Sequence, residues 1–214
     1  MKKLIKLSLL AVFLGIHPMG CIKEEVQSPC AGSNFATLVE TESFDTHYSK
    51  VLIHHDSVIQ VIGWVDFSEY HHFDEIALSL IISKTKRIAE HTFNLQIGNE
   101  AYACSPPIPK VDNPISKIDI IYNGDSLFYN SSFGTLVGGD TISDLFEYSF
   151  YGHNYNEVIK PIKIFLPQEQ YENEELTLKV ASANSDLLTL NFDVLLTDSN
   201  GKSFEFKKQT FNLR

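Results

Sequence analysis

The sequence is poor in cysteine, methionine, tryptophan and basic residues. Its 214 residues include 3 cysteines, 2 methionines, 1 tryptophan and 17 lysines and arginines, against 27 acidic residues. The formal net charge of −10 argues against a nucleic-acid partner, because proteins that bind DNA or RNA gather Lys and Arg on one face. A hydrophobic content of 43% is enough to build a folded core, which excludes a disordered or collagen-like chain.

Several catalytic signatures are also absent. The chain holds no Gly-x-Ser-x-Gly, His-Glu-x-x-His, P-loop or Gly-x-Gly-x-x-Gly motif. Its carboxylates are scattered, so any acid–base pair would have to be assembled by the fold. These absences argue against an enzyme without excluding one, and no cofactor is predicted.

The clearest long apolar run lies near the start of the chain. Lys2, Lys3 and Lys6 precede an apolar run from Leu7 to Ile16, and residues 1–20 contain no acidic side chain. This order is typical of a secretory signal peptide. The run has about half of the ~20 residues that a membrane-spanning helix needs, so we expect the leader to be removed. Its removal would change the charge from −10 to −13, because three lysines go with it.

The residues at the end of the leader resemble the signal of bacterial lipoproteins. Pro18, Met19, Gly20 and Cys21 stand where that family carries its lipobox, although Pro18 replaces the usual leucine. The resemblance implies that the Cys21 thiol is diacylated and becomes the first residue of the mature protein. Two or three acyl chains would then hold the protein on the membrane, because each buried methylene adds about 0.8 kcal/mol.

A short charged motif follows the cysteine. Lys23, Glu24 and Glu25 resemble the Lys-(Asp/Glu)-(Asp/Glu) tag that accompanies surface export in Bacteroidetes-type lipoproteins, and a solvated tether is the simpler alternative. We therefore expect a protein anchored to outer-membrane lipid through Cys21, on the cell surface or the periplasmic face. The predicted organisation is a signal peptide over 1–20, a lipidated tether over 21–32 and one domain over 33–214.

The two remaining cysteines, Cys30 and Cys104, are candidates for a disulfide. The predicted compartment permits oxidation, and a bridge closing so long a loop would stabilise the fold by roughly 4 kcal/mol in the chain-entropy model. Two free buried thiols are the alternative. Metal binding is less favoured, because neither cysteine has a Cys-x-x-Cys partner.

Hydrophobic residues alternate with polar ones from about residue 33 onward, which is the period of a β-strand. Many short strands separated by turn signals predict a mainly β protein, an antiparallel β-sandwich of Ig-like or related type. The alternating residues are Ile59, Val61, Val65 and Phe67; Ile76, Leu78, Leu80 and Ile82; Phe93, Leu95 and Ile97; Ile118, Ile120 and Tyr122; Phe146, Tyr148 and Phe150; Ile162, Ile164 and Leu166; Leu176, Leu178 and Val180; and Leu188, Leu190, Phe192, Val194 and Leu196. Residues 77–89 also fit one side of a helix, so both interpretations stay open there.

The pattern of residues near the end of the chain predicts a hairpin. Asn200 and Gly201 supply the turn between the last alternating run and residues 203–213. Within that final segment the parity changes near Lys207 and Lys208, which indicates a β-bulge. Half of the prolines fall between residues 105 and 114, where a sub-boundary or a crossover between sheets is expected. We favour one domain.

Two histidine pairs could supply metal ligands. His54 and His55 form one pair, and His71 and His72 form the other, with Asp74 nearby. One histidine from each pair could bind zinc or copper. Adjacent side chains on a strand point to opposite faces, however, so ordinary surface histidines are the more economical interpretation.

An aromatic cluster between residues 128 and 155 could bind a ligand. Tyr129, Tyr151 and Tyr155 are flanked by glycine and asparagine, including Asn154, a combination that suits the apolar faces and hydroxyls of sugars. Core packing is the favoured alternative for the cluster as a whole.

The sequence thus favours a lipid-anchored envelope protein that acts by binding, or as a structural or assembly component. Its further partner would be an envelope protein or a glycan. A metal-handling lipoprotein that uses the paired histidines is one alternative. A carbohydrate-binding or carbohydrate-active protein is the other.

Overall fold

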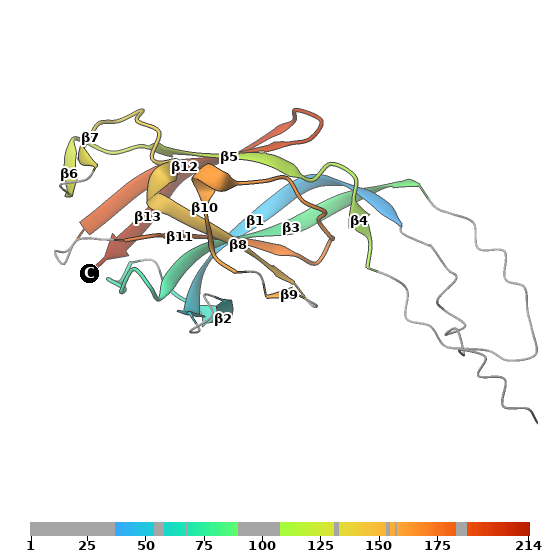
Figure 1. Ribbon diagram of the computed structural model, residues 1–214, viewed down its shortest axis with the longest axis horizontal. Helices are drawn as coiled ribbons and strands as arrows, with labels where there is room; N and C mark the ends of the chain where they lie inside the picture. Colours follow the sequence, from blue (N-terminus) through green and yellow to red (C-terminus); the bar gives the residue numbers. More distant parts are fainter. Residues whose placement is uncertain are drawn as a thin grey trace, which may run out of the picture. The chain divides into compact units, whose positions relative to one another are not determined.

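The computed structural model describes residues 37–53, 58–66, 68–89, 108–130, 133–152, 155–156, 158–182 and 188–214 (Figure 1). The predicted signal peptide and tether lie outside the described residues. So do the following residues singled out above: Cys21, Cys30, Cys104, His54, His55, Phe67, Phe93, Leu95, Ile97 and Asn154.

The described chain is built almost entirely of strands. Its elements are β1 (Leu38–Ile53), β2 (Ile59–Trp64), β3 (Ile76–Ala89), β4 (Lys110–Val111), β5 (Ile115–Tyr122), β6 (Leu127–Asn130), β7 (Gly134–Leu136), η1 (Ser143–Leu145), β8 (Phe146–Gly152), β9 (Tyr155–Asn156), β10 (Lys160–Pro161), η2 (Ile162–Ile164), β11 (Glu175–Val180), β12 (Leu188–Asp198) and β13 (Ser203–Leu213). Helix in these residues is confined to the 3-10 turns η1 and η2, and none is long and apolar enough to cross a membrane. The 77–89 segment is a strand.

The strands form two main sheets, as the sequence predicts for a β-sandwich. The larger sheet has the order β10-β8-β11-β3-β1-β2, with β4 beside β1 and β9 beside β8. The second sheet has the order β13-β12-β5, and β6 pairs with β7 (Figure 1). Pairing between these strands is antiparallel except between β1 and β4, where Leu38 lies beside Lys110.

One hydrophobic core joins the two sheets. Phe146 of the larger sheet packs against Phe192 of the second sheet, with 5.0 Å between the ring centroids. Elements on both sides of residues 105–114 contribute to this core, including Ile76, Leu78 and Leu80 before it and Ile118, Ile120 and Tyr122 after it. Burying this apolar surface supplies the main favourable free energy of folding.

The final hairpin and its bulge are confirmed. Gly201 has a positive φ of 82° in the turn. Opposite Asp193 the register shifts, so that Phe192 pairs with Gln209 and Val194 with Phe206. The two lysines at 207 and 208 therefore face a single partner residue, which is the definition of a β-bulge.

The predicted strand containing Ile162, Ile164 and Leu166 is wrong. Pairing stops at Pro161, which lies opposite Glu147, because the partner strand β8 begins only one residue further on. The chain then enters the 3-10 turn η2. Ile162 is buried, while Ile164 and Leu166 are exposed.

The two edges of the larger sheet approach each other. Val58, just before β2, forms a β-bridge with Val158, just before β10, and β2 also contacts β8. Since β2 and β10 are the opposite ends of the strand order, the sheet curls over the face that does not contact the second sheet. We call this face the inner face of the curled sheet.

Candidate functional site

A row of polar side chains crosses the inner face of the curled sheet. In register, Ser79 of β3 lies opposite both His47 of β1 and Thr177 of β11, and Thr177 lies opposite Ser149 of β8. Residues directly opposite each other in a ladder project from the same face. Ser79, Thr177 and Ser149, which we call the hydroxyl row, are all buried.

Apolar side chains cover one part of this face. Val51, Ile59 and Ala77 form a small second core with Val61 and Ile159. These residues come from β1, β2, β3 and the segment before β10, so they join the two edges of the sheet. The bridge between the edges keeps this part of the inner face out of water.

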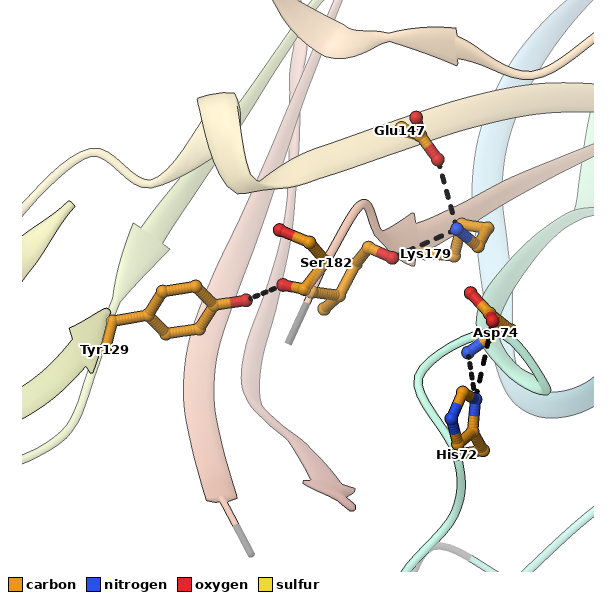
Figure 2. A network of polar contacts seen from close by, with 7 residues as sticks. His72, Asp74, Tyr129, Glu147, Lys179 and Ser182 are labelled. Carbon is orange, nitrogen blue, oxygen red and sulfur yellow. Dashed lines mark hydrogen bonds and ion pairs between the residues drawn. The ribbon is translucent and has the colours of Figure 1, made fainter. Parts of the chain in front are cut away.

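A buried ion pair lies beside the hydroxyl row. Lys179 is only 2% exposed, and its Nζ donates to Glu147 Oε2 at 3.0 Å and to the Val180 carbonyl at 3.0 Å. Figure 2 shows the lysine pointing toward Glu147, its direct cross-strand partner. A buried ammonium needs such partners because removing it from water is costly. The positive charge of Lys179 is therefore balanced within the sheet.

Two buried atoms near this pair have no hydrogen-bond partner among the described residues. They are Thr177 Oγ1 in the hydroxyl row and Glu175 Oε1, two residues earlier on β11. A buried polar atom without a partner costs about 1–3 kcal/mol. Such groups in native proteins call for an explanation, and binding a polar ligand is one.

Aromatic rings accompany these polar groups. Trp64 lies opposite Ser49 on the inner face, and its indole stacks on the imidazole of His47 with a centroid distance of 4.6 Å and an interplanar angle of 2°. The indole is nevertheless 73% exposed. Tyr151 of β8 is half-buried and lies directly opposite Glu175. The face therefore combines flat aromatic surface with a carboxylate and hydroxyls.

The predicted binding rim is only partly assembled. Tyr129 is fully buried, and its hydroxyl donates to the Ser182 carbonyl (Figure 2). Burial raises the pKa of Tyr129 to about 12, and Phe133 packs edge-on against its ring. Tyr129 therefore packs in the core and not on an exposed rim, and its role in ligand binding stays a prediction.

The other members of the predicted rim have different outcomes. Tyr151 lies on the inner face, as described above. Tyr155 is paired through its backbone with Gly152, but its side chain lies outside the described part, as does Asn154. For these two residues the ligand-binding role stays a prediction.

The structure does not bring the described histidines to a common site. His71 Nε2 lies 3.0 Å from the Asp66 carbonyl oxygen, whereas His72 Nδ1 lies 3.5 Å from Asp74 Oδ2 (Figure 2). Within the described ranges, no group of three or more His, Cys, Asp or Glu residues could hold a metal ion. The first pair, His54 and His55, lies outside these ranges, so the full metal prediction is untested.

Sequence reasoning did not single out Trp64, Glu175 or Thr177. The sequence held two signals, and the first is that Trp64 is the sole tryptophan. Polar residues also alternate with leucines along β11. Neither signal reveals which strands pair, and the hydroxyl row exists only because its strands pair in the larger sheet.

Comparison of the chain with family models, with curated proteins and with solved structures gives no match.

Proposed function

We propose that this chain is a lipid-anchored protein of the outer membrane that acts by binding a polar ligand on the inner face of the curled sheet. The anchor is supported by the lipobox-like residues ending at Cys21 and by the charged residues that follow. Whether the protein stands on the cell surface or on the periplasmic face depends on whether Lys23, Glu24 and Glu25 act as an export tag.

A single observation carries the binding proposal. Thr177 is completely buried, and its hydroxyl oxygen has no partner among the described residues. Glu175, two residues earlier, is only half-buried, but its Oε1 atom is likewise buried without a partner. Because strand side chains alternate, both project from the same face of β11. A ligand with hydroxyl or amide groups would satisfy both atoms and recover their desolvation cost, and it could reach them only if the curled sheet opens, because neither oxygen is accessible in the closed structure.

A purely structural or assembly role is the competing proposal. It would require that Thr177 contributes only to packing. A metal-handling role finds no supporting cluster in the described residues. We therefore favour binding.

Detergent partitioning tests the anchor. The wild-type protein should enter the detergent phase because acyl chains are hydrophobic, and Cys21→Ala should stay in the aqueous phase. Mass spectrometry of the mature N-terminus should show the acyl groups on Cys21. An aqueous wild type or an unmodified cysteine would contradict the proposal.

Thermal unfolding tests the binding face. Thr177→Val removes the unpaired hydroxyl at nearly constant shape, so the unliganded variant should melt at or above the wild-type temperature. A panel of neutral sugars, amino acids and nucleosides is then added to both proteins. A bound compound at about 100 times its Kd stabilises the wild type by about 2.7 kcal/mol and should stabilise the variant less.

Thr135→Val is the matched control, because Thr135 is exposed on β7 and away from the inner face. This variant should respond to every compound as the wild type does. If no compound shifts the wild type, or if Thr177→Val responds equally to each of them, the inner face is not the binding site.

A further inference from the structure

We infer that the folded domain rests on membrane lipid through one end, where an open groove and exposed apolar side chains surround the start of β1. This inference rests on the acylated Cys21 of the proposed function and assigns a second lipid contact to the domain itself. The surface consists of Leu38, Ile88, Leu166 and the groove beside them, and we call it the tether end.

The groove at the tether end has a volume of about 540 Å³ and is open to solvent. Its walls come from the start of β1, from β4 and from the segment after η2. The apolar residues that line it are Leu38, Val111, Pro114 and Pro167.

The backbone around the groove is already hydrogen-bonded. The Lys110 N–H donates to the Thr37 carbonyl at 2.9 Å, and the Val111 N–H donates to the Gln170 carbonyl at 2.8 Å. An added β-strand would need unpaired backbone groups along an edge. The groove therefore offers apolar surface and does not suit strand addition.

Large apolar side chains stand in water around this groove. Leu166 precedes Pro167 of the groove wall and is 72% exposed. Ile88 precedes Ala89, the strand partner of Leu38, and is 49% exposed. Exposed apolar surface beside a groove is typical of sites that contact a membrane or another protein. Such side chains gain free energy when they leave water for an apolar environment.

The place of the tether end in the chain selects lipid as its occupant. Only residues 22–36 separate Cys21 from Thr37, which directly precedes Leu38. This stretch spans at most about 50 Å when fully extended. An acylated Cys21 would keep the tether end within that distance of the bilayer. The lipid contact is then intramolecular, so a weak affinity is enough to populate it.

Charge at the tether end favours a zwitterionic lipid surface over an anionic one. The Lys110 ammonium lies 2.6 Å from Glu169 Oε1, so its charge is compensated. Asp112 adds an exposed carboxylate to the groove wall, where an ethanolamine ammonium group could bind. The chain also carries a net charge of −10, which repels an anionic surface. We therefore expect phosphatidylethanolamine to support the contact better than phosphatidylglycerol.

Tryptophan reporters and brominated lipids test the contact. Trp64→Phe removes the only native tryptophan, and Leu166→Trp or Ile88→Trp then places one reporter at the tether end. The acylated protein is purified from membranes and reconstituted into vesicles of phosphatidylcholine and phosphatidylethanolamine, with and without brominated acyl chains. Bromine quenches tryptophan only at short range. Because interfacial apolar side chains lie about 5–10 Å deep, both reporters should lose roughly half of their emission in the brominated vesicles.

Val137→Trp in the same background is the matched control. Val137 is 53% exposed and follows β7, which Figure 1 shows at the opposite end of the strand layers from β4. Its emission should be the same in both kinds of vesicle. Urea unfolding of each variant checks that the fold is retained, and the second reporter keeps the test decisive if one variant does not fold.

The inference is overturned if the protein floats with the vesicles while neither reporter at the tether end is quenched. Equal quenching of all three reporters, or stronger quenching with phosphatidylglycerol, also overturns it. A blue shift that grows with protein concentration in the absence of vesicles would assign the tether end to a second copy of the chain instead. Protein that does not float with vesicles would refute the acylated anchor of the proposed function, and this inference with it.

Discussion

At the scale of single residues, burial decides what a tyrosine can do. Tyr129 and Tyr151 look alike in the sequence, since both stand near glycine and asparagine. In the fold, the ring of Tyr129 enters the core while Tyr151 lies beside Glu175 on the inner face. Local composition does not distinguish them, because burial depends on what the rest of the chain places over each ring.

The buried hydroxyl of Tyr129 makes the protein sensitive to alkaline pH. Its pKa is about 12 in the folded state because of burial, compared with about 10 in an unfolded chain. The neutral hydroxyl therefore contributes stability that is fully present below pH ~10 and is lost as the pH rises through ~12. Tyr129→Phe should cost about 1 kcal/mol near neutral pH, because the hydrogen bond to Ser182 is lost, and should reduce the alkaline loss.

Urea unfolding near pH 7 and near pH 11 measures both effects. The exposed Tyr70→Phe is the control, and it should leave the pH dependence unchanged. The same alkaline loss in wild type and Tyr129→Phe would show that another group is responsible.

At the scale of elements, the bulge in the final hairpin sets which side chains face the core. Phe204 and Phe206 precede it, and Phe211 and Leu213 follow it on the opposite parity. The extra residue allows Phe204, Phe211 and Leu213 all to be buried. Lys208 adopts a φ of 57° there, which is uncommon for a residue with a side chain.

Asp193 holds the bulge in place. Its Oδ1 accepts hydrogen bonds from the Lys208 backbone N at 2.7 Å and from Asn123 Nδ2 at 2.9 Å. Asp193→Ala should therefore destabilise the fold by about 1–2 kcal/mol, because hydrogen bonds to a charged acceptor are lost. Chemical denaturation measures the change.

Glu205→Ala serves as the control on the same hairpin. Glu205 is exposed and pairs with Lys207 at 3.2 Å, an interaction expected to contribute less than about 0.5 kcal/mol. Equal losses for the two variants would mean that Asp193 acts only through general surface charge.

At the scale of the whole molecule, the parallel pairing of β1 with β4 bears on the predicted disulfide. Leu38 lies beside Lys110 and Val39 beside Val111, so the two chain segments run in the same direction about one strand spacing apart. Cys30 and Cys104 precede these paired residues by similar stretches of chain. The two cysteines themselves lie outside the described residues, so their pairing stays a prediction.

We predict that Cys30 and Cys104 form a disulfide that stabilises the fold by roughly 4 kcal/mol. Peptide mapping without reductant should recover the linked pair from Cys21→Ala protein, which contains no other cysteine. Reduction should lower the melting temperature. Recovery of two alkylated thiols from protein that was never reduced would refute the bond.

Strand pairing across the whole fold explains why the candidate site was not predicted from the sequence. His47, Ser79, Ser149 and Thr177 lie on four strands that are far apart in the sequence and pair in the order β1-β3-β11-β8. Alternation tells which residues of one strand share a face, but it carries no information about the neighbouring strand. The hydroxyl row therefore could not be predicted from the spacing of residues along the sequence.

The amino-acid sequence was enough to predict the β-class, the sandwich-like layering and the final hairpin with its bulge. These features follow from a local property, the two-residue period of side chains along a strand, and from the turn at Asn200 and Gly201. The fold was needed to establish which strands pair, that the sheet curls until Val58 meets Val158, and that Thr177 and Trp64 lie on its inner face. These features escape local patterns because register and strand order depend on the burial of the whole core, to which distant segments contribute together.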